Sequence, residues 1–291
     1  MQPEPAPVIE PQKSSLPSRL GVIAAAGAIP IAVCEAAQAK GIEVFVAALR
    51  GQAGPDIEQF PHRWIRIGEL GGMIGALRKA ECEEIVIVGA LRRPNIWRAG
   101  MDFGFIRHLP TILSLTRGGD DTILKRVVRF FEAQGFTVRG AHEFAPSLLA
   151  PHGPCGKHTA SEAQLADIRH GLALLDVLGP FDVGQGVVVS HHQILAVEAA
   201  EGTDGMLKRC GALHQWGRKG RSGVLVKAPK AGQELRVDMP VIGPRTVENA
   251  AAAGLAGIAV MSGQVMIADQ SETISLADRH GIFLMGIDRT A

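Results

Sequence analysis

Short apolar runs alternate along the first half of this chain with segments whose apolar residues recur at helical spacing. Residues 20–25 (LGVIAA), 42–49 (IEVFVAAL) and 83–91 (EEIVIVGAL) have the composition of buried strands, and residues 31–41 and 70–80 have the spacing of helices. Two parallel strands need a crossover connection, which is normally a helix. The alternation therefore predicts an α/β domain with a Rossmann-like parallel sheet over residues 19–147.

Further elements extend this pattern through the rest of the chain. In the first half, we expect strands at 63–68 and from 136, and helices around 105–116 and 120–134. In the second half, we expect a helix, a hairpin turning at Ser190–Gln193, and a helix with Thr203 or Asp204 as its N-cap. Strands and helices then alternate to the end of the chain: strands at 224–229, 256–261 and 282–287, helices at 245–254 and 274–281.

The segment between the two halves has no apolar period. Residues 148–164 are rich in Pro, Gly and small polar residues, which is typical of an interdomain linker. We therefore expect two α/β domains, residues 19–147 and 165–291, with a substrate cleft between them. Residues 1–18 are polar and proline-rich and are expected to form a disordered leader.

Charge and composition argue against several classes of protein. The net charge is +1, with 30 basic and 29 acidic residues, so we expect no nucleic acid partner. The four cysteines lie far apart and form no CxxC pair, which argues against a disulfide framework and favours a reducing cytoplasm. No HExxH, GxSxG or Walker A motif is present, which argues against zinc hydrolases, serine hydrolases and P-loop enzymes.

Four glycine-bearing polar segments interrupt the apolar elements. In IAAAGAIP (23–30), Gly27 and Ala28 precede a helix whose first N–H groups are suited to a phosphate, although the glycines of a dinucleotide fingerprint are missing. In TRGGDDTILKR (116–126), helix capping accounts for one of Asp120 and Asp121 and leaves the other open to a functional role. His142, in GAHE, is a further candidate site residue.

The third segment, VEAAEGTDGML (197–207), gathers carboxylates at a helix start. Glu198, Glu201 and Asp204 surround Gly202 and Thr203, and a capped surface helix needs only one carboxylate. Glycine, a threonine hydroxyl and free N–H groups suit a phosphate or pyrophosphate oxygen. Carboxylates in the same place suit a hard cation such as Mg²⁺.

A fourth segment sets one carboxylate among cations on a proline-stiffened loop. VLVKAPKAGQELRVDMPVIGPRTV (224–247) contains Lys227, Lys230, Arg236 and Asp238. Lys227 ends a strand, at the edge of the sheet where α/β proteins carry their sites. The prolines fix φ and limit the freedom of the loop. Asp238 either pairs locally with Arg236 or a lysine, or serves a metal or an attacking water beside an anionic substrate.

Five stretches together identify a known family by resemblance. EGTDGML, VLVKAPKAGQELRVDMPVIGPRTV, AAAGLAGIAV, DVGQGVVV and GAHE resemble the I-type UDP-2,3-diacylglucosamine pyrophosphatases of lipid A biosynthesis in Gram-negative bacteria, from about Leu20 to Ile287. This chain departs from the family in reading AAAG where a glycine run is usual, and KAPKAGQ where KAPKPGQ is common. The resemblance implies hydrolysis of UDP-2,3-diacylglucosamine to UMP and 2,3-diacylglucosamine 1-phosphate (lipid X), with water directed to the sugar-side phosphorus.

The resemblance also implies a setting and a set of site residues. The enzyme would be a cytoplasmic homodimer, peripheral to the inner membrane, using Mg²⁺ or another divalent cation. Asp238, in RVDMP, would be catalytic and a metal ligand, while Lys227 would offset phosphate charge, aided by Lys230 or Arg236. The other residues predicted to bind substrate are Gly27, Ala28, Asp120, Asp121, His142, Gln185, Glu201, Gly202, Thr203, Asp204, Lys230 and Pro240.

Two matters stay open at this level. Met73, Ile74, Leu77 and residues 103–105 are loose candidates for an apolar trench that would hold the acyl chains. Without the resemblance, the best interpretation is a non-catalytic two-domain regulator that binds a nucleotide, and a Rossmann oxidoreductase is a third interpretation.

Overall fold

The first half of the chain forms a five-stranded parallel sheet in the computed structural model, which describes residues 16–91, 120–213 and 220–289. The strand order is β3-β2-β1-β4-β5, and every neighbouring pair is parallel. This arrangement confirms the predicted Rossmann-like sheet. Its strands are β1 Arg19–Ala24, β2 Glu43–Leu49, β3 His62–Ile65, β4 Glu84–Val88 and β5 Thr137–Arg139.

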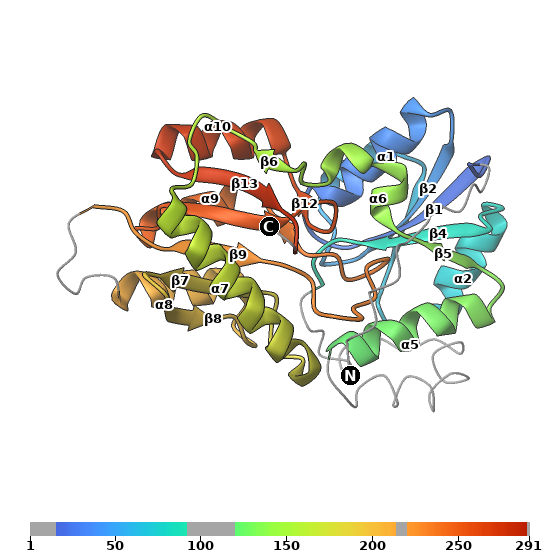
Figure 1. Cartoon of the computed structure of the whole chain (residues 1–291). Coiled ribbons are helices and arrows are strands. Elements are labelled where there is room, and N and C mark those ends of the chain that lie inside the picture. Colours follow the sequence, from blue (N-terminus) through green and yellow to red (C-terminus); the bar gives the residue numbers. More distant parts are fainter. Residues whose placement is uncertain (1–15, 92–119, 214–219, 290–291) are drawn as a thin grey trace.

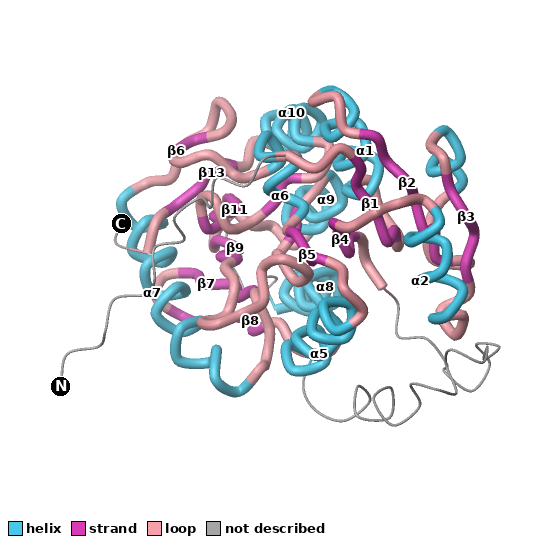
Figure 2. The backbone as a smooth tube through the Cα atoms, turned by 90° about the vertical axis from the view of Figure 1, so that its right-hand side faces the viewer, coloured by secondary structure: helices cyan, strands magenta, loops and turns pink. Residues whose placement is uncertain are grey.

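Helices cover both faces of this sheet. Successive strand residues point to opposite faces, so Val22 of β1 packs in one core and Ile23 in another. Helix α1 (Ile29–Ala39), the short α6 (Ala141–Phe144) and the 3-10 helix η1 (Pro55–Gln59) contribute to the first core. Helices α2 (Leu70–Lys79) and α5 (Asp120–Ala133) contribute to the second. Figure 2 shows the row of strands with α1 on one side and α2 and α5 on the other.

The second half forms a six-stranded mixed sheet in the order β6-β13-β11-β9-β7-β8 (Figure 2). Strands β9, β11 and β13 are parallel, whereas β6, β7 and β8 run antiparallel to their neighbours. The two sheets bear out the expectation of two α/β domains. The bounds are β6 Gly153–Pro154, β7 Gly186–Ser190, β8 Gln193–Val197, β9 Val224–Lys227, β11 Gly257–Met261 and β13 Phe283–Ile287.

Four helices pack on this second sheet. Helix α7 (Glu162–Leu178) lies against β7 and β9, where Gly171 allows a close approach, because a Cβ there would be 2.9 Å from a methyl group of Val226. Helix α8 (Gly202–Leu213) packs on β7 and β8, and it contacts α9 (Pro244–Ala252), which in turn contacts α10 (Gln270–His280). No helix in the described ranges combines the length and apolarity needed to cross a membrane.

The β7–β8 hairpin turns where the sequence predicts. His191 and His192 adopt φ of 53° and 61°, as a tight two-residue hairpin turn requires. The carboxylate of Asp167 on α7 accepts hydrogen bonds from both of their amides, at 2.9 and 2.6 Å. These two hydrogen bonds satisfy the carboxylate oxygens of the buried Asp167.

The segment expected to be a linker takes part in structure on both sides. Leu149 bridges to Met266, β6 adds an edge strand to the second sheet, and Ser161 caps α7, which begins at Glu162. Two strands that the sequence did not predict, β10 (Val241–Ile242) and β12 (Met266–Ile267), pair in parallel. Met266 is buried in the α1-side core of the first domain, so the second half of the chain helps to build that core.

Candidate functional site

Three chain segments meet at the carboxyl end of β9. Gly186, at the start of β7, pairs with Lys227, at the end of β9. The amide of Ala228 donates to the carbonyl of Gln185 at 3.0 Å, and the amide of Glu198 donates to the carbonyl of Gly186 at 2.8 Å. The antiparallel pairing of β7 with β8 and β9 therefore brings these residues to one edge of the second sheet, just before α8 begins.

Lys227 is a buried cation at this edge, with only 6% of its surface exposed. Its Nζ donates to Oγ1 of Thr203 at 2.6 Å, and that hydroxyl donates to Oε1 of Glu198 at 2.8 Å. Burial lowers the pKa of Lys227, and the negative charges of Glu198 and Asp238 act in the opposite direction. The side chain of Lys227 is thus buried, bonded to a hydroxyl and within the electrostatic influence of two carboxylates.

Asp238 is oriented by two side-chain amides. Its Oδ2 accepts from Nε2 of Gln233 at 2.8 Å and lies 3.4 Å from Nε2 of Gln185. Gln233 also donates to the carbonyl of Asp238, and the amide of Asp238 donates to the carbonyl of Glu234 at 2.9 Å. The side chain and the main chain of Asp238 are therefore both held in place by hydrogen bonds. A carboxylate that acted on a substrate would need such fixed geometry.

The Asp238 loop, residues 228–240, is anchored to the first domain. Val237 and Met239, on either side of Asp238, pack against the α2-side core and the α1-side core respectively. Arg236 donates to Oε1 of Glu132 on α5 at 2.9 Å and lies 3.4 Å from the carbonyl of Val138. Figure 1 shows this segment after β9 running between the two sheets.

Arg236 has carboxylate partners in the protein, whereas the sequence offered it as an aid to Lys227. Its Nε and Nη2 donate to the two carboxylate oxygens of Glu234, each at 2.8 Å, and these bonds are the main cause of its raised pKa. With Glu132 as its second partner, the guanidinium is occupied by protein carboxylates and ties the loop to α5. We therefore assign it to the loop rather than to a phosphate.

Three other predicted charges also have protein partners. Lys230 forms an ion pair with Asp182. Glu201 pairs with Arg209 at 2.6 Å, which lowers the pKa of Glu201. Asp204 joins α8 to α9: it pairs with Arg245 and accepts from Nδ2 of Asn249 at 2.7 Å.

Helix α8 begins earlier than predicted. Gly202 is its first residue and adopts φ of +72°, a conformation that glycine reaches without strain. Thr203 and Asp204 therefore lie in the first turn and are not N-caps. This position allows the Thr203 hydroxyl to reach both Lys227 and Glu198.

The remaining candidates belong to the first domain or lie close to it. Gly27 has φ of +106° and precedes Ala28, the N-cap of α1. His142 is half-buried, and burial lowers its pKa; its Nδ1 has no hydrogen-bond partner among the described residues. Pro240 is buried, and its carbonyl accepts from the amide of Met266 at 2.9 Å. The side chains of Asp120 and Asp121 lie outside the described residues.

The candidates for the acyl trench are wrong where they can be checked. Met73, Ile74 and Leu77 lie on the buried face of α2, with at most 7% of their surface exposed, and pack in the α2-side core. Their helical spacing reflects ordinary core packing. Residues 103–105 lie outside the described residues.

The donor set at Asp238 fits a divalent cation that is bound chiefly by phosphate. The described residues contain no group of three or more His, Cys, Asp or Glu that could hold a metal ion by themselves. Mg²⁺ is commonly held by one or two carboxylates together with substrate phosphates and water, so the Asp238 carboxylate suits such an ion. Glu198 supplies a second carboxylate at this edge, and the sequence assigned it no role of its own.

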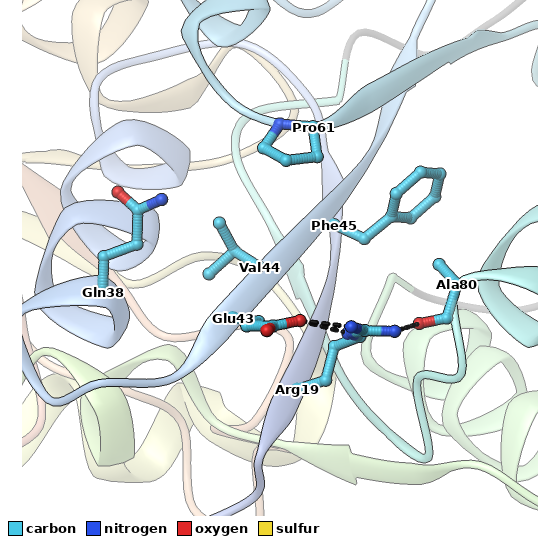
Figure 3. Close-up of a pocket in the computed structure, with 7 residues that line it drawn as sticks. All are labelled: Arg19, Gln38, Glu43, Val44, Phe45, Pro61 and Ala80. Carbon is cyan, nitrogen blue, oxygen red and sulfur yellow. Dashed lines mark hydrogen bonds and ion pairs between the residues drawn. The ribbon is translucent and has the colours of Figure 1, made fainter.

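Two cavities lie away from this edge. One of about 340 Å³ lies at the amino ends of β1 and β2, where Arg19 donates to Glu43 and to the carbonyl of Ala80 (Figure 3). The other, of about 450 Å³, is lined in the second domain by Lys157, His158 and Arg221 among others. Neither is lined by Lys227 or Asp238, so the cleft between the domains stays a prediction.

Comparisons with known proteins agree with the two-domain organisation. The family model for the LpxI N-terminal domain matches residues 19–148, and that for the LpxI C-terminal domain matches residues 151–285. The UDP-2,3-diacylglucosamine pyrophosphatase LpxI of Caulobacter vibrioides is 39% identical over 273 residues, which cover 93% of this chain and 98% of that protein. Similarity of this extent shows that the chain belongs to the LpxI family.

Proposed function

We propose that this protein hydrolyses the pyrophosphate bond of UDP-2,3-diacylglucosamine, releasing UMP and 2,3-diacylglucosamine 1-phosphate. The observation that carries the proposal is the 39% identity, over nearly the whole chain, to a relative named for this reaction. The site geometry supports it: a buried cation and an oriented carboxylate suit an anionic diphosphate and an attacking water.

In the proposed hydrolysis, Asp238 acts on the water and Lys227 acts on the diphosphate. The oxygen of water bonds to one phosphorus while the bond from that phosphorus to the bridging oxygen breaks, and the bridging oxygen leaves with the other phosphate. Asp238, held by Gln233 and Gln185, orients the water and accepts its proton. Lys227, fixed by Thr203, stabilises the charge that grows on the non-bridging oxygens.

We further propose that the reaction uses Mg²⁺ or a similar divalent cation, with Asp238 as its protein ligand. Bound there with the diphosphate, such an ion neutralises phosphate charge. Chelation of the metal is expected to reduce turnover, and added Mg²⁺ is expected to restore it. The family resemblance also leads us to propose a cytoplasmic homodimer that meets its lipid-linked substrate at the membrane surface.

The test is turnover by the purified full chain. Wild-type protein with the UDP-lipid and Mg²⁺ is expected to release UMP, and in ¹⁸O-water the label appears in the product whose phosphorus was attacked. Asp238→Asn keeps the shape of the side chain but removes the base, so kcat is expected to fall roughly 10²- to 10⁴-fold. The matched control is Asp56→Asn, an exposed position in the first domain, with kcat unchanged.

Other outcomes point to the other interpretations. Tight binding of the UDP-lipid without UMP release would favour the non-catalytic nucleotide-binding regulator. Fluorescence changes on titration with a nicotinamide cofactor would favour an oxidoreductase. Near-normal kcat in Asp238→Asn would refute the assignment of Asp238 even if the reaction itself is observed.

A further inference from the structure

Glu198 is half-buried, and the reaction described above does not use its carboxylate. It follows β8 directly, and its Oε1 accepts from the Thr203 hydroxyl at 2.8 Å. Its Oε2 is buried and has no hydrogen-bond partner among the residues that the structure describes. Burying a carboxylate oxygen without a donor is costly, so this placement calls for a compensating interaction.

Helix capping does not explain the position of Glu198. A carboxylate before a helix normally accepts backbone N–H groups of the first turn. Within the described contacts, Glu198 instead bonds the side chain of Thr203, and its own amide continues the ladder to Gly186. The side chain of Glu198 therefore contacts a side chain of the site and not the backbone N–H groups of α8.

Two glycines, one just before β7 and one at its start, leave room for Glu198. A Cβ on Gly184 would lie 2.2 Å from the carbonyl oxygen of Glu198, and a Cβ on Gly186 would lie 2.6 Å from its Oε2. Neither glycine has a left-handed φ, so space rather than backbone conformation accounts for them. The absence of side chains at Gly184 and Gly186 therefore leaves the space that Glu198 occupies.

The compensating interaction is the charge of Lys227. Among the negative charges that act on the buried ammonium, Glu198 has the larger effect and Asp238 the smaller. The Thr203 hydroxyl joins the two, because it accepts from Lys227 and donates to Glu198. Thr203 is the one hydrogen-bond acceptor that the described residues give to Lys227, which leaves two N–H donors for an anionic ligand.

We propose that Glu198 is a positioning residue for the reaction: through the Thr203 hydroxyl, its carboxylate fixes the Lys227 ammonium at the edge of the sheet where Asp238 lies. The inference rests on the proposed function, because only that function supplies the substrate on which Lys227 acts. It predicts that the charge of Glu198 matters to kcat only while Lys227 is present.

A double-mutant cycle tests this coupling. UMP release gives kcat and KM for the full-length wild type, Glu198→Gln, Lys227→Met and the double variant. We expect Glu198→Gln to lower kcat about 10- to 100-fold while KM changes less than about threefold. The reason is that a displaced Lys227 ammonium loses its interaction with the transition state more than its interaction with the bound substrate. We expect the double variant to be no slower than Lys227→Met alone. Glu272→Gln, exposed on α10, is the matched control and keeps wild-type kcat.

The outcomes separate the inference from the proposed function. No UMP from wild type refutes the function itself. Active wild type with a normal kcat in Glu198→Gln, or with effects of the two substitutions that multiply, overturns only the role of Glu198. If circular dichroism shows that Glu198→Gln does not fold, Thr203→Val decides: it breaks the same link and is expected to show the same loss of kcat, and a normal kcat there overturns the inference.

Discussion

At the scale of single residues, the space beside Gly184 controls how closely the start of β7 approaches the end of β8. A Cβ at this position would overlap the backbone of Glu198, which cannot turn aside as a side chain can. We expect Gly184→Ala to destabilise the fold by about 1–3 kcal/mol, as overpacking does, and to lower kcat by displacing Glu198. Urea unfolding and UMP release measure the two effects.

The control for this substitution is Gly75→Ala. Gly75 is exposed within α2, and a Cβ there would meet nothing within 4 Å. Alanine is the better helix former by about 1 kcal/mol, so this variant is expected to be more stable than wild type. Equal stability of the two variants would contradict the steric argument.

We expect His142 to make the stability of the fold depend on pH. Burial lowers its pKa, so the folded protein favours the neutral imidazole, and the smaller effect of Glu143 only opposes this. The unfolded chain takes up a proton at this histidine more readily than the folded protein does. The folded state therefore keeps its full free energy of unfolding above the unfolded pKa of about 6.5 and loses part of it as the pH falls below that value. We therefore expect the fall in Tm between about pH 7.5 and 5.5 to be smaller in His142→Gln than in wild type. Parallel curves for the two proteins would show that His142 is not the group responsible.

At the scale of elements, Arg236 should act on the reaction through the Asp238 loop. Arg236→Met keeps the apolar stem but removes the bonds to Glu132 and Glu234, so the loop loses a tie to the first domain. We expect kcat to fall several-fold, while Tm drops little, because partly exposed ion pairs contribute about 0–1 kcal/mol. Arg66→Met is the control, since it breaks an exposed pair with Glu69 far along the chain from the loop. An equal kcat in both variants would show that the tie between the Asp238 loop and the first domain does not affect catalysis.

The same scale shows which features the sequence could predict. Strands such as β2 and β4 were predictable because their apolar runs are long, whereas β10 and β12 have two residues each and no period to recognise. Lys227 and Asp238 were predicted from one segment. The link of Lys227 to Glu198 was not, because it depends on hydrogen bonds between β9, α8 and the residue after β8, which only folding brings together.

At the scale of the whole molecule, the domains share apolar side chains across the chain's two halves. The linker prediction was reasonable from composition, yet periodicity cannot tell which core an apolar residue joins. Met239 and Val241 from the second half pack against the α1-side core of the first domain, as do Leu148 and Leu149. Loosening one domain should therefore disturb the other, and the two should unfold together.

Two methionines test this cooperative unfolding. Met266 is buried in the first domain's core although the second half carries it, whereas Met206 is buried wholly within the second domain. Replacing either by alanine should cost about 2–5 kcal/mol, the usual range for buried methionine. In calorimetry we expect one transition for wild type and for Met206→Ala, at a lower Tm in the variant, because the shared core still couples the domains. Met266→Ala should weaken that coupling and separate the transition into two. A single transition in Met266→Ala, shifted as in Met206→Ala, would mean that other contacts between the halves hold the domains together.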